Sequence, residues 1–153
     1  MNTPGNNTID EAQGALIREF AQFGDNWLKK YEHLVRMGNS LPPMDPRNKT
    51  DDNLIRGCQS QVWLHSYQNN GTVHFEVDCD SQITKGIAAV LVKILSGQNP
   101  DAIQNAELYS LDEIGLRKHL SPTRSNGLDS MVKQMKNFQE NGDARDEKNS
   151  RDS

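Results

Sequence analysis

The sequence is poor in cysteine, with only Cys58 and Cys79 among its 153 residues. Neither has a second cysteine a few positions away, and this excludes both the closely spaced pair of a zinc knuckle and the cysteine pattern of a disulfide scaffold. Two isolated thiols fit a protein of the reducing cytoplasm. We therefore expect two free thiols, and the role of each depends on the residues around it in the sequence.

Long apolar runs are also missing, so we expect no membrane span. The polar segment 1–8 lacks a basic start followed by an apolar stretch, which argues against a secretory signal. The net charge of −4 and a pI of about 5.5 argue against a nucleic-acid partner, because such partners attract basic patches. No glycine-rich phosphate loop and no paired-carboxylate pattern occurs, so neither of these common catalytic signatures applies.

Hydrophobic residues are scarce, at 34% of the chain, and the mean hydropathy is −0.80. Such values indicate that part of the chain lies outside a packed core. We predict a flexible N-terminus over residues 1–8, one domain over residues 9–138 and a disordered tail over residues 139–153. The tail is rich in charged and small polar residues and contains nothing from which a core is built.

Apolar residues at helical spacing predict four main helices. The first follows the capping-box pattern of residues 8–11, in which a threonine and a glutamate satisfy free amides at a helix start. A second helix is expected from Trp27 to Gly38, a third is capped at Asp80 or Ser81, and the last begins at Ser121-Pro122.

Between the second and third helices, residues 60–68 and 72–78 partly alternate between apolar and polar, which is typical of strands. Asn70-Gly71 between them predicts a tight hairpin turn, because both residue types tolerate positive φ. The turn fixes the register of the core side as three pairs: Val62 with Cys79, Leu64 with Val77, and Ser66 with Phe75. The same parity directs Cys58 toward the core, and the short piece 53–55 is a candidate third strand.

Two separate motifs carry a family resemblance. Residues 57–64 read Gly-Cys-Gln-Ser-Gln-Val-Trp-Leu, and residues 119–128 read His-Leu-Ser-Pro-Thr-Arg-Ser-Asn-Gly-Leu. Both resemble conserved blocks of the SufE family, the sulfur-acceptor partners of cysteine desulfurases. Three further features fall in that family's order: the helix with Trp27 and Tyr31, the loop at 41–42, and the acidic strand end at 78–80. The resemblance extends from about residue 9 to residue 138.

The resemblance implies an α+β fold, in which a small antiparallel three-stranded sheet has helices packed mainly on one face, as in the scaffold proteins of iron–sulfur assembly. It also implies a function. A SufS-like, pyridoxal-phosphate-dependent cysteine desulfurase would pass persulfide sulfur to Cys58 and be stimulated by doing so. Sulfur would then move to an iron–sulfur scaffold complex. On this interpretation the chain is a sulfur-transfer accessory protein that needs no cofactor and has no turnover of its own.

Cys58 is therefore the expected persulfide acceptor, since a thiolate is the nucleophile in such transfers. Gly57 gives the chain freedom to move beside it, and Gln59 and Ser60 are expected to support the same loop. In the second motif, Arg124 either favours the thiolate or contacts the desulfurase, or it is an ordinary exposed arginine in the first turn of a helix. His119 either approaches the thiol or is a structural histidine.

Two alternatives remain open. The first is a metal- or cluster-holding scaffold that uses Cys58, Cys79 and histidines, although the sequence lacks any close cysteine pair. The second is a thiol hydrolase with Cys58 as nucleophile and His119 as base. For Cys79 itself, the register favours a small hydrophobic residue on the core side over a resolving thiol. We expect no metal site.

Overall fold

The computed structural model describes residues 8–138. The predicted flexible N-terminus and disordered tail fall on residues 1–7 and 139–153, which lie outside the described residues, and on Thr8, which caps the first helix. In chain order the elements are α1 (Ile9–Ala21), α2 (Trp27–Asn39), the 3₁₀ turns η1 (Pro46–Asn48) and η2 (Asp51–Asn53), β1 (Val62–Asn69), β2 (Thr72–Cys79), α3 (Gln82–Leu95), α4 (Pro100–Gln104), α5 (Tyr109–Ile114), α6 (Leu116–His119) and α7 (Pro122–Lys136).

The predicted capping box at the first helix is confirmed. The Thr8 hydroxyl accepts the backbone N–H of Glu11 at 3.1 Å, and the Glu11 carboxylate accepts the backbone N–H of Thr8 at 2.8 Å. The later helices use the same chemistry: the side chains of Ser81 and Ser121 each accept an amide of the first turn of α3 and α7. These caps fix where α3 and α7 begin, and both helix starts lie at the site described below.

The hairpin has the register that the sequence predicts. Val62 pairs with Cys79 and Leu64 with Val77, in an antiparallel ladder that closes at Asn70 and Gly71. Both turn residues have positive φ, 55° and 80°, as a two-residue turn of this kind requires. The core side of the hairpin is buried and consists of Val62, Leu64, Val73, Phe75 and Val77.

The prediction of a three-stranded sheet is wrong, because the sheet within residues 8–138 has two strands. Leu54 forms one isolated antiparallel bridge with Trp63, and the N–H of Ile55 donates to the carbonyl of Val62 at 2.9 Å. The 3₁₀ turn η2 ends just before this piece, and the backbone turns away just after it at Gly57, where φ is +94°. The extended piece is therefore too short to build a ladder.

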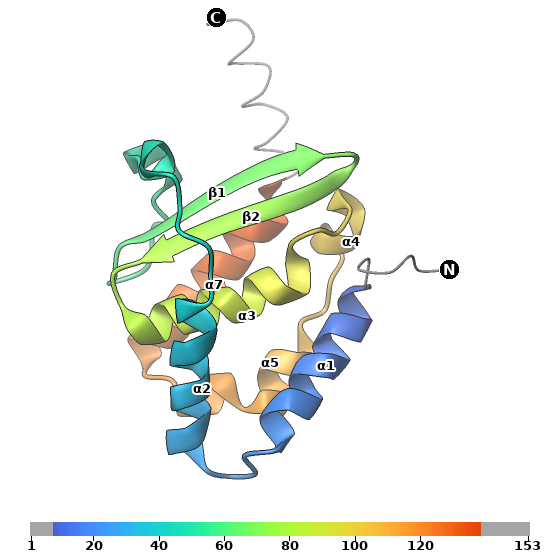
Figure 1. The fold of residues 1–153 in the computed structure, drawn as a ribbon, viewed down its shortest axis with the longest axis vertical. Coiled ribbons are helices and arrows are strands. Elements are labelled where there is room, and N and C mark those ends of the chain that lie inside the picture. The colour runs from blue at the N-terminus through green and yellow to red at the C-terminus, as the bar shows by residue number, and fades with distance from the viewer. Residues whose placement is uncertain (1–7, 139–153) are drawn as a thin grey trace, which may run out of the picture.

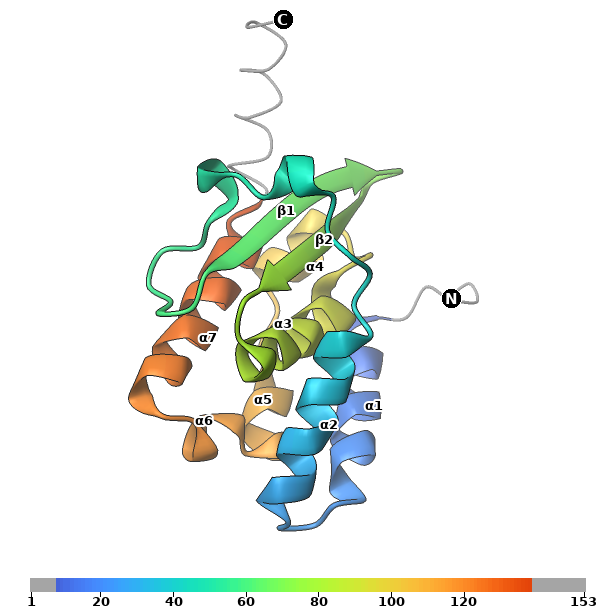
Figure 2. The same ribbon diagram turned by 60° about the vertical axis from the view of Figure 1, so that its left-hand side comes forward.

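Helices cover the core side of the hairpin, which confirms the α+β class (Figures 1 and 2). Helix α3 packs against β2 and against α2, and it approaches α2 closely because Gly86 has no side chain; a Cβ there would collide with the backbone of Leu34. Helix α7 lies on the far side of α3, beside the loop that leads into β1 (Figure 2). None of the helices between residues 8 and 138 has the length and apolar character needed to cross a lipid bilayer.

Residues from the segment before β1 contact the outer side of the hairpin. Lys49 forms an ion pair with Asp78, and its ammonium group lies 5.3 Å from the ring centroid of Trp63. Asn48 donates from its side chain to Glu76 at 3.2 Å. These contacts fix the position of the segment that leads to the Cys58 loop.

Candidate functional site

The loop of residues 56–61 carries Cys58 and is fixed at both ends. At its base, the hydrogen bond from Ile55 to Val62 closes the loop. Near β1, the N–H of Gln61 donates to the Asp80 carboxylate at 3.0 Å, and the N–H of Asp80 donates back to the carbonyl of Gln61 at 3.2 Å. These hydrogen bonds tie both ends of the loop to the hairpin.

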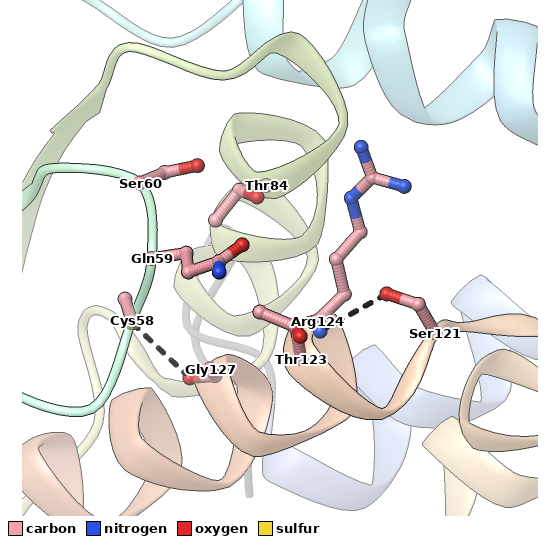
Figure 3. A pocket seen from close by; sticks show the side chains of 8 residues that line it. All are labelled: Cys58, Gln59, Ser60, Thr84, Ser121, Thr123, Arg124 and Gly127. Atoms are coloured by element: carbon pink, nitrogen blue, oxygen red, sulfur yellow. Dashed lines mark hydrogen bonds between the residues drawn. The ribbon is translucent and has the colours of Figure 1, made fainter.

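Cys58 is half-buried and faces α7. Its Sγ lies 3.7 Å from the carbonyl oxygen of Gly127, a distance that suits a weak S–H hydrogen bond (Figure 3). A Cβ added at Gly127 would lie 3.3 Å from that sulfur, which is tighter than normal packing. The absence of a side chain at position 127 therefore lets the sulfur approach the helix backbone without a shift of the loop.

Gly57 allows a second close approach of the same loop to α7. Its φ of +94° belongs to the left-handed region, and a Cβ there would collide with the hydroxyl of Ser130. The glycine before the thiol is thus required by the backbone conformation and by the space available. A strand of regular parity does not reach Cys58, and the thiol is directed inward by this turn instead.

A pocket of about 250 Å³ opens beside the thiol. Its walls come from three segments that are distant in sequence: the Cys58 loop, the first turn of α3 and the start of α7 (Figure 3). The lining residues are Cys58, Gln59, Ser60, Thr84, Ser121, Thr123, Arg124 and Gly127. Of the predicted site residues, Cys58, Gln59, Ser60 and Arg124 therefore share one pocket, and Gly57 adjoins it.

Arg124 is an exposed residue in the first turn of α7, and it is among the residues that line the same pocket as Cys58. Its backbone N–H donates to the Ser121 hydroxyl at 3.3 Å. Its guanidinium has no ion-pair or hydrogen-bond partner within the part of the chain that the structure describes. A charged group without an acidic partner at the mouth of a pocket is available for a ligand or a partner protein.

Burial raises the pKa of the Cys58 thiol above its ordinary value, because the loss of contact with water disfavours the charged thiolate. At neutral pH the resting group is therefore predominantly a thiol. The Arg124 side chain is exposed, and burial is the cause of the raised pKa of Cys58. A partner that changes the surroundings of Cys58 also changes its reactivity.

Cys79 is half-buried at the end of β2 and is absent from the pocket lining. Burial is the main reason why its pKa rises to about 11, and the Ser81 N–H, which donates to its sulfur at 3.4 Å, opposes that rise only partly. Its pairing with Val62 is the one the sequence predicts, and the side chain packs against the core.

His119 lies outside the pocket lining. Its ring stacks on Trp27 with the centroids 3.9 Å apart, and its Nδ1 lies 3.1 Å from the carbonyl oxygen of Gly115. The hydroxyl of Tyr31 donates to the His119 carbonyl at 2.7 Å. These contacts join α2 to α6, which is the structural role considered for this histidine, and the observed hydrogen bond of Cys58 is made to Gly127 instead.

Sequence reasoning did not single out four of the lining residues as site residues: Thr84, Ser121, Thr123 and Gly127. Three of them lie in the second motif, so the motif itself was the available signal. Thr84 had no such signal, because only the packing of α3 against α7 brings it to the thiol. Among residues 8–138 no three histidine, cysteine, aspartate or glutamate residues lie close enough together to hold a metal ion.

Comparison with known proteins decides the family. The model of the SufE family, described as an Fe-S metabolism associated domain, matches residues 14–139. The chain belongs to the SufE family. An uncharacterized SufE-like protein of Rhizobium meliloti is 34% identical over 126 residues, which cover 79% of this chain and 89% of that protein. The family places the protein in iron–sulfur metabolism.

The fold of this SufE-family protein also occurs in a solved structure. The solution structure of a hypothetical protein from Thermus thermophilus superposes with a TM-score of 0.67, over 82% of this chain and 90% of that one. The sequence identity is 18%, so this likeness concerns the fold alone. The family match spans the Cys58 loop and α7, the two segments that carry the motifs.

Proposed function

We propose that this SufE-family protein accepts persulfide sulfur at Cys58 from a cysteine desulfurase, stimulates that enzyme, and passes the sulfur to an iron–sulfur cluster scaffold. The observation that carries the proposal is the position of Cys58. It lies in a segment whose sequence resembles a SufE motif, and the loop that carries it has paired ends and lines a pocket. The protein transfers sulfur and has no turnover of its own.

The transfer is a thiol–persulfide exchange. The Cys58 thiolate attacks the outer sulfur of the desulfurase persulfide, a new S–S bond forms on Cys58, and the desulfurase cysteine leaves as a thiolate. The proton of Cys58 passes to solvent or to a base of the partner before the attack. The same exchange in reverse, toward an acceptor on the scaffold, releases the sulfur and restores the thiol.

The resting geometry supports a carrier that protects its sulfur. Half-burial against Gly127 and the raised pKa both keep Cys58 unreactive in the isolated protein. Docking of the desulfurase has to move the loop outward, and Gly57 supplies the backbone freedom for that movement. Hydrogen exchange of residues 56–60 with and without the desulfurase tests this step. Faster exchange is expected in the complex, and equal protection in both states contradicts the movement.

Arg124 is assigned a supporting role in this proposal. Arg124 lines the same pocket as Cys58, and its guanidinium has no acidic partner in residues 8–138, so it can stabilise the negative charge of a thiolate or persulfide once the loop has moved. Gln59 and Ser60 present an amide and a hydroxyl to the same space. The role of His119 as a supporting residue remains a prediction, and its contacts with Trp27 and Gly115 favour a structural one.

The alternative of a metal- or cluster-holding scaffold has no set of three ligands to support it in residues 8–138. The thiol hydrolase has no observed contact between its two residues, since Cys58 bonds to Gly127 and His119 to Gly115. The sulfur acceptor is therefore the function that the described residues support best.

The decisive variant is Cys58→Ser, with Cys79→Ser as a matched control. Both replace one half-buried thiol by a hydroxyl. We expect Cys58→Ser to fold, to bind the desulfurase with unchanged affinity and to abolish the stimulation of sulfide release. Cys79→Ser should retain the stimulation. Full stimulation by Cys58→Ser would refute the acceptor role.

A further inference from the structure

The pocket beside Cys58 has an unusual charge for this protein. The chain has a net charge of −4, yet the pocket is lined by four hydroxyl groups, one amide and one guanidinium, and no carboxylate is among its lining residues. The hydroxyls belong to Ser60, Thr84, Ser121 and Thr123. Donors of hydrogen bonds and one positive charge thus surround a space that is open next to a sulfur atom.

The start of helix α7 adds to the positive potential. This helix has 15 residues, and its first turn forms one wall of the pocket. The N-cap hydroxyl of Ser121 satisfies the amide of Arg124, and Pro122 has no amide, so the N–H of Thr123 is left for another acceptor. Aligned peptide dipoles and a free amide at a helix start favour an anion.

Thr84 gives an independent indication of a ligand. The residue is only 7% exposed and its side chain lies between Ser60 and Arg124 in the pocket (Figure 3). The backbone N–H of Thr84 donates to the Ser81 hydroxyl, whereas the Thr84 hydroxyl has no hydrogen-bond partner in the described residues. Within those residues every fully buried polar side-chain atom has a partner. The Thr84 hydroxyl has none, so it is not fully buried and is accessible from the pocket that Thr84 lines. An acceptor oxygen there satisfies it.

We propose that this pocket binds a small oxyanion of sulfur, thiosulfate or sulfite, beside the sulfur of Cys58. The arrangement of Thr84, Thr123 and Arg124 around one space fits an anion with several acceptor oxygens. A pocket of about 250 Å³ has room for such an ion and a few waters. Binding does not depend on the proposed function, but the consequence for sulfur transfer rests on Cys58 being a persulfide carrier.

The bound ion gives Cys58 a second sulfur exchange, with a small molecule in place of a protein. The Cys58 thiolate attacks the outer sulfur of thiosulfate, an S–S bond forms on Cys58, and the S–S bond of thiosulfate breaks. The electron pair of the broken bond leaves with sulfite. In the opposite direction, sulfite removes the outer sulfur of the Cys58 persulfide and leaves as thiosulfate. Atoms and charges balance without an oxidant or a reductant.

Binding is tested by NMR titration of ¹⁵N-labelled Cys58→Ser protein, which cannot accept sulfur. Thiosulfate and sulfite are added separately, with chloride as the ionic-strength control. Saturable shifts are expected at Ser60, Thr84 and Thr123. Arg124→Gln should weaken binding about tenfold or more, and Thr84→Val about three- to tenfold, because each removes a donor to a charged acceptor. Lys133→Gln removes a positive charge from an exposed site further along α7 and should change nothing.

Transfer is tested by incubating the wild-type protein with thiosulfate. The expected result is one added sulfur on the peptide that holds Cys58 and one equivalent of released sulfite, with slower transfer in Thr84→Val. Absence of saturable shifts, or equal binding by Arg124→Gln, would overturn the binding site. Saturable binding that leaves Cys58 unmodified would overturn the exchange and identify a general anion site.

Charging of the same protein batch by a desulfurase and cysteine separates the two proposals. If the desulfurase adds sulfur to Cys58 and thiosulfate neither binds nor reacts, the oxyanion site is wrong and the acceptor role stands. If thiosulfate adds sulfur and a competent desulfurase does not, the acceptor role fails and the oxyanion site stands.

Discussion

The sulfur of Cys58 lies 3.7 Å from the carbonyl oxygen of Gly127, so the backbone of helix α7 forms the wall behind the thiol. This contact joins the two segments whose sequences resemble SufE motifs, through residues that are 69 positions apart. It contributes to the burial of the thiol and limits the access of reagents to it. The reactivity of Cys58 therefore depends on a helix position that has no side chain.

Gly127→Ala should make Cys58 more reactive. The new Cβ would lie 3.3 Å from the sulfur, so the loop has to move outward by a few tenths of an ångström. We expect faster modification by a thiol reagent in the Cys79→Ser background, where Cys58 is the one cysteine left. The measurement is the rate of modification followed by mass spectrometry.

Gly14→Ala in α1 is the matched control, because its Cβ meets only the end of the Arg18 side chain at 3.4 Å. Both substitutions gain helix propensity, worth about 0.5–1 kcal/mol in a helix interior. Gly14→Ala should show that gain in the free energy of unfolding and leave the Cys58 rate unchanged. Equal rates in the two variants would contradict the role of Gly127 as the wall.

Gly57→Ala should destabilise the protein for two reasons that can be separated. The left-handed φ of +94° costs a non-glycine residue about 1–2 kcal/mol, and the Cβ also collides with the Ser130 hydroxyl. Gly71→Ala, in a turn with φ of +80° and nothing within 4 Å of its Cβ, carries the first cost alone. Urea unfolding of the variants gives the difference.

Ser130→Ala removes the colliding hydroxyl. The cost of Gly57→Ala in that background should fall toward the cost of Gly71→Ala. If the two costs of Gly57→Ala, with and without the Ser130 hydroxyl, are the same, the close approach of the loop to α7 does not matter for stability.

The reactivity of Cys58 should rise with pH through and beyond the range in which an ordinary thiol titrates. Thiol reagents attack the thiolate, and burial raises the pKa of Cys58, so less thiolate is present at neutral pH than in an unfolded chain. The test is the modification rate of Cys79→Ser protein from about pH 7 to pH 10, folded and in urea. A folded midpoint at or below the midpoint in urea would contradict the burial effect.

Cys79 should make stability depend on pH at the alkaline end. Its folded pKa of about 11 lies above the ordinary value of 9.0, so the folded state holds the proton more tightly than the unfolded state. The contribution is fully present below the unfolded pKa and is lost as pH rises through about 9 to 11. The free energy of unfolding should therefore fall less steeply with pH in Cys79→Ala than in the wild-type protein over this range. Equal slopes in the two proteins would show that folding does not raise the pKa of Cys79.

The hairpin could be predicted in detail because its determinants are local. Asn70-Gly71 fixes the turn and the alternation of apolar residues fixes which face is buried, so the register depends on no tertiary contact. The prediction of a third strand is wrong, also for a local reason. Residues 53–55 are expected from the sequence to be extended, but Asn53 belongs to the 3₁₀ turn η2 and the chain turns at Gly57, which leaves room for one bridge at Leu54.

The site could be predicted only as far as its motifs reach. Cys58 and Arg124 each lie in a motif, yet the pocket they share depends on how α7 crosses α3. Thr84 stands out in no pattern of the sequence, and its burial beside the thiol follows from that crossing alone. His119 lies in the same motif as Arg124, but its ring faces Trp27, because a motif does not specify which way each side chain points.

The most direct test of the central claim is the mass of the protein after incubation with a competent cysteine desulfurase and cysteine. The account predicts one additional sulfur, removed by a reducing agent and located on the peptide that contains Cys58, with the Cys79 peptide unmodified. A desulfurase that turns over cysteine while the Cys58 peptide keeps its original mass would contradict the account.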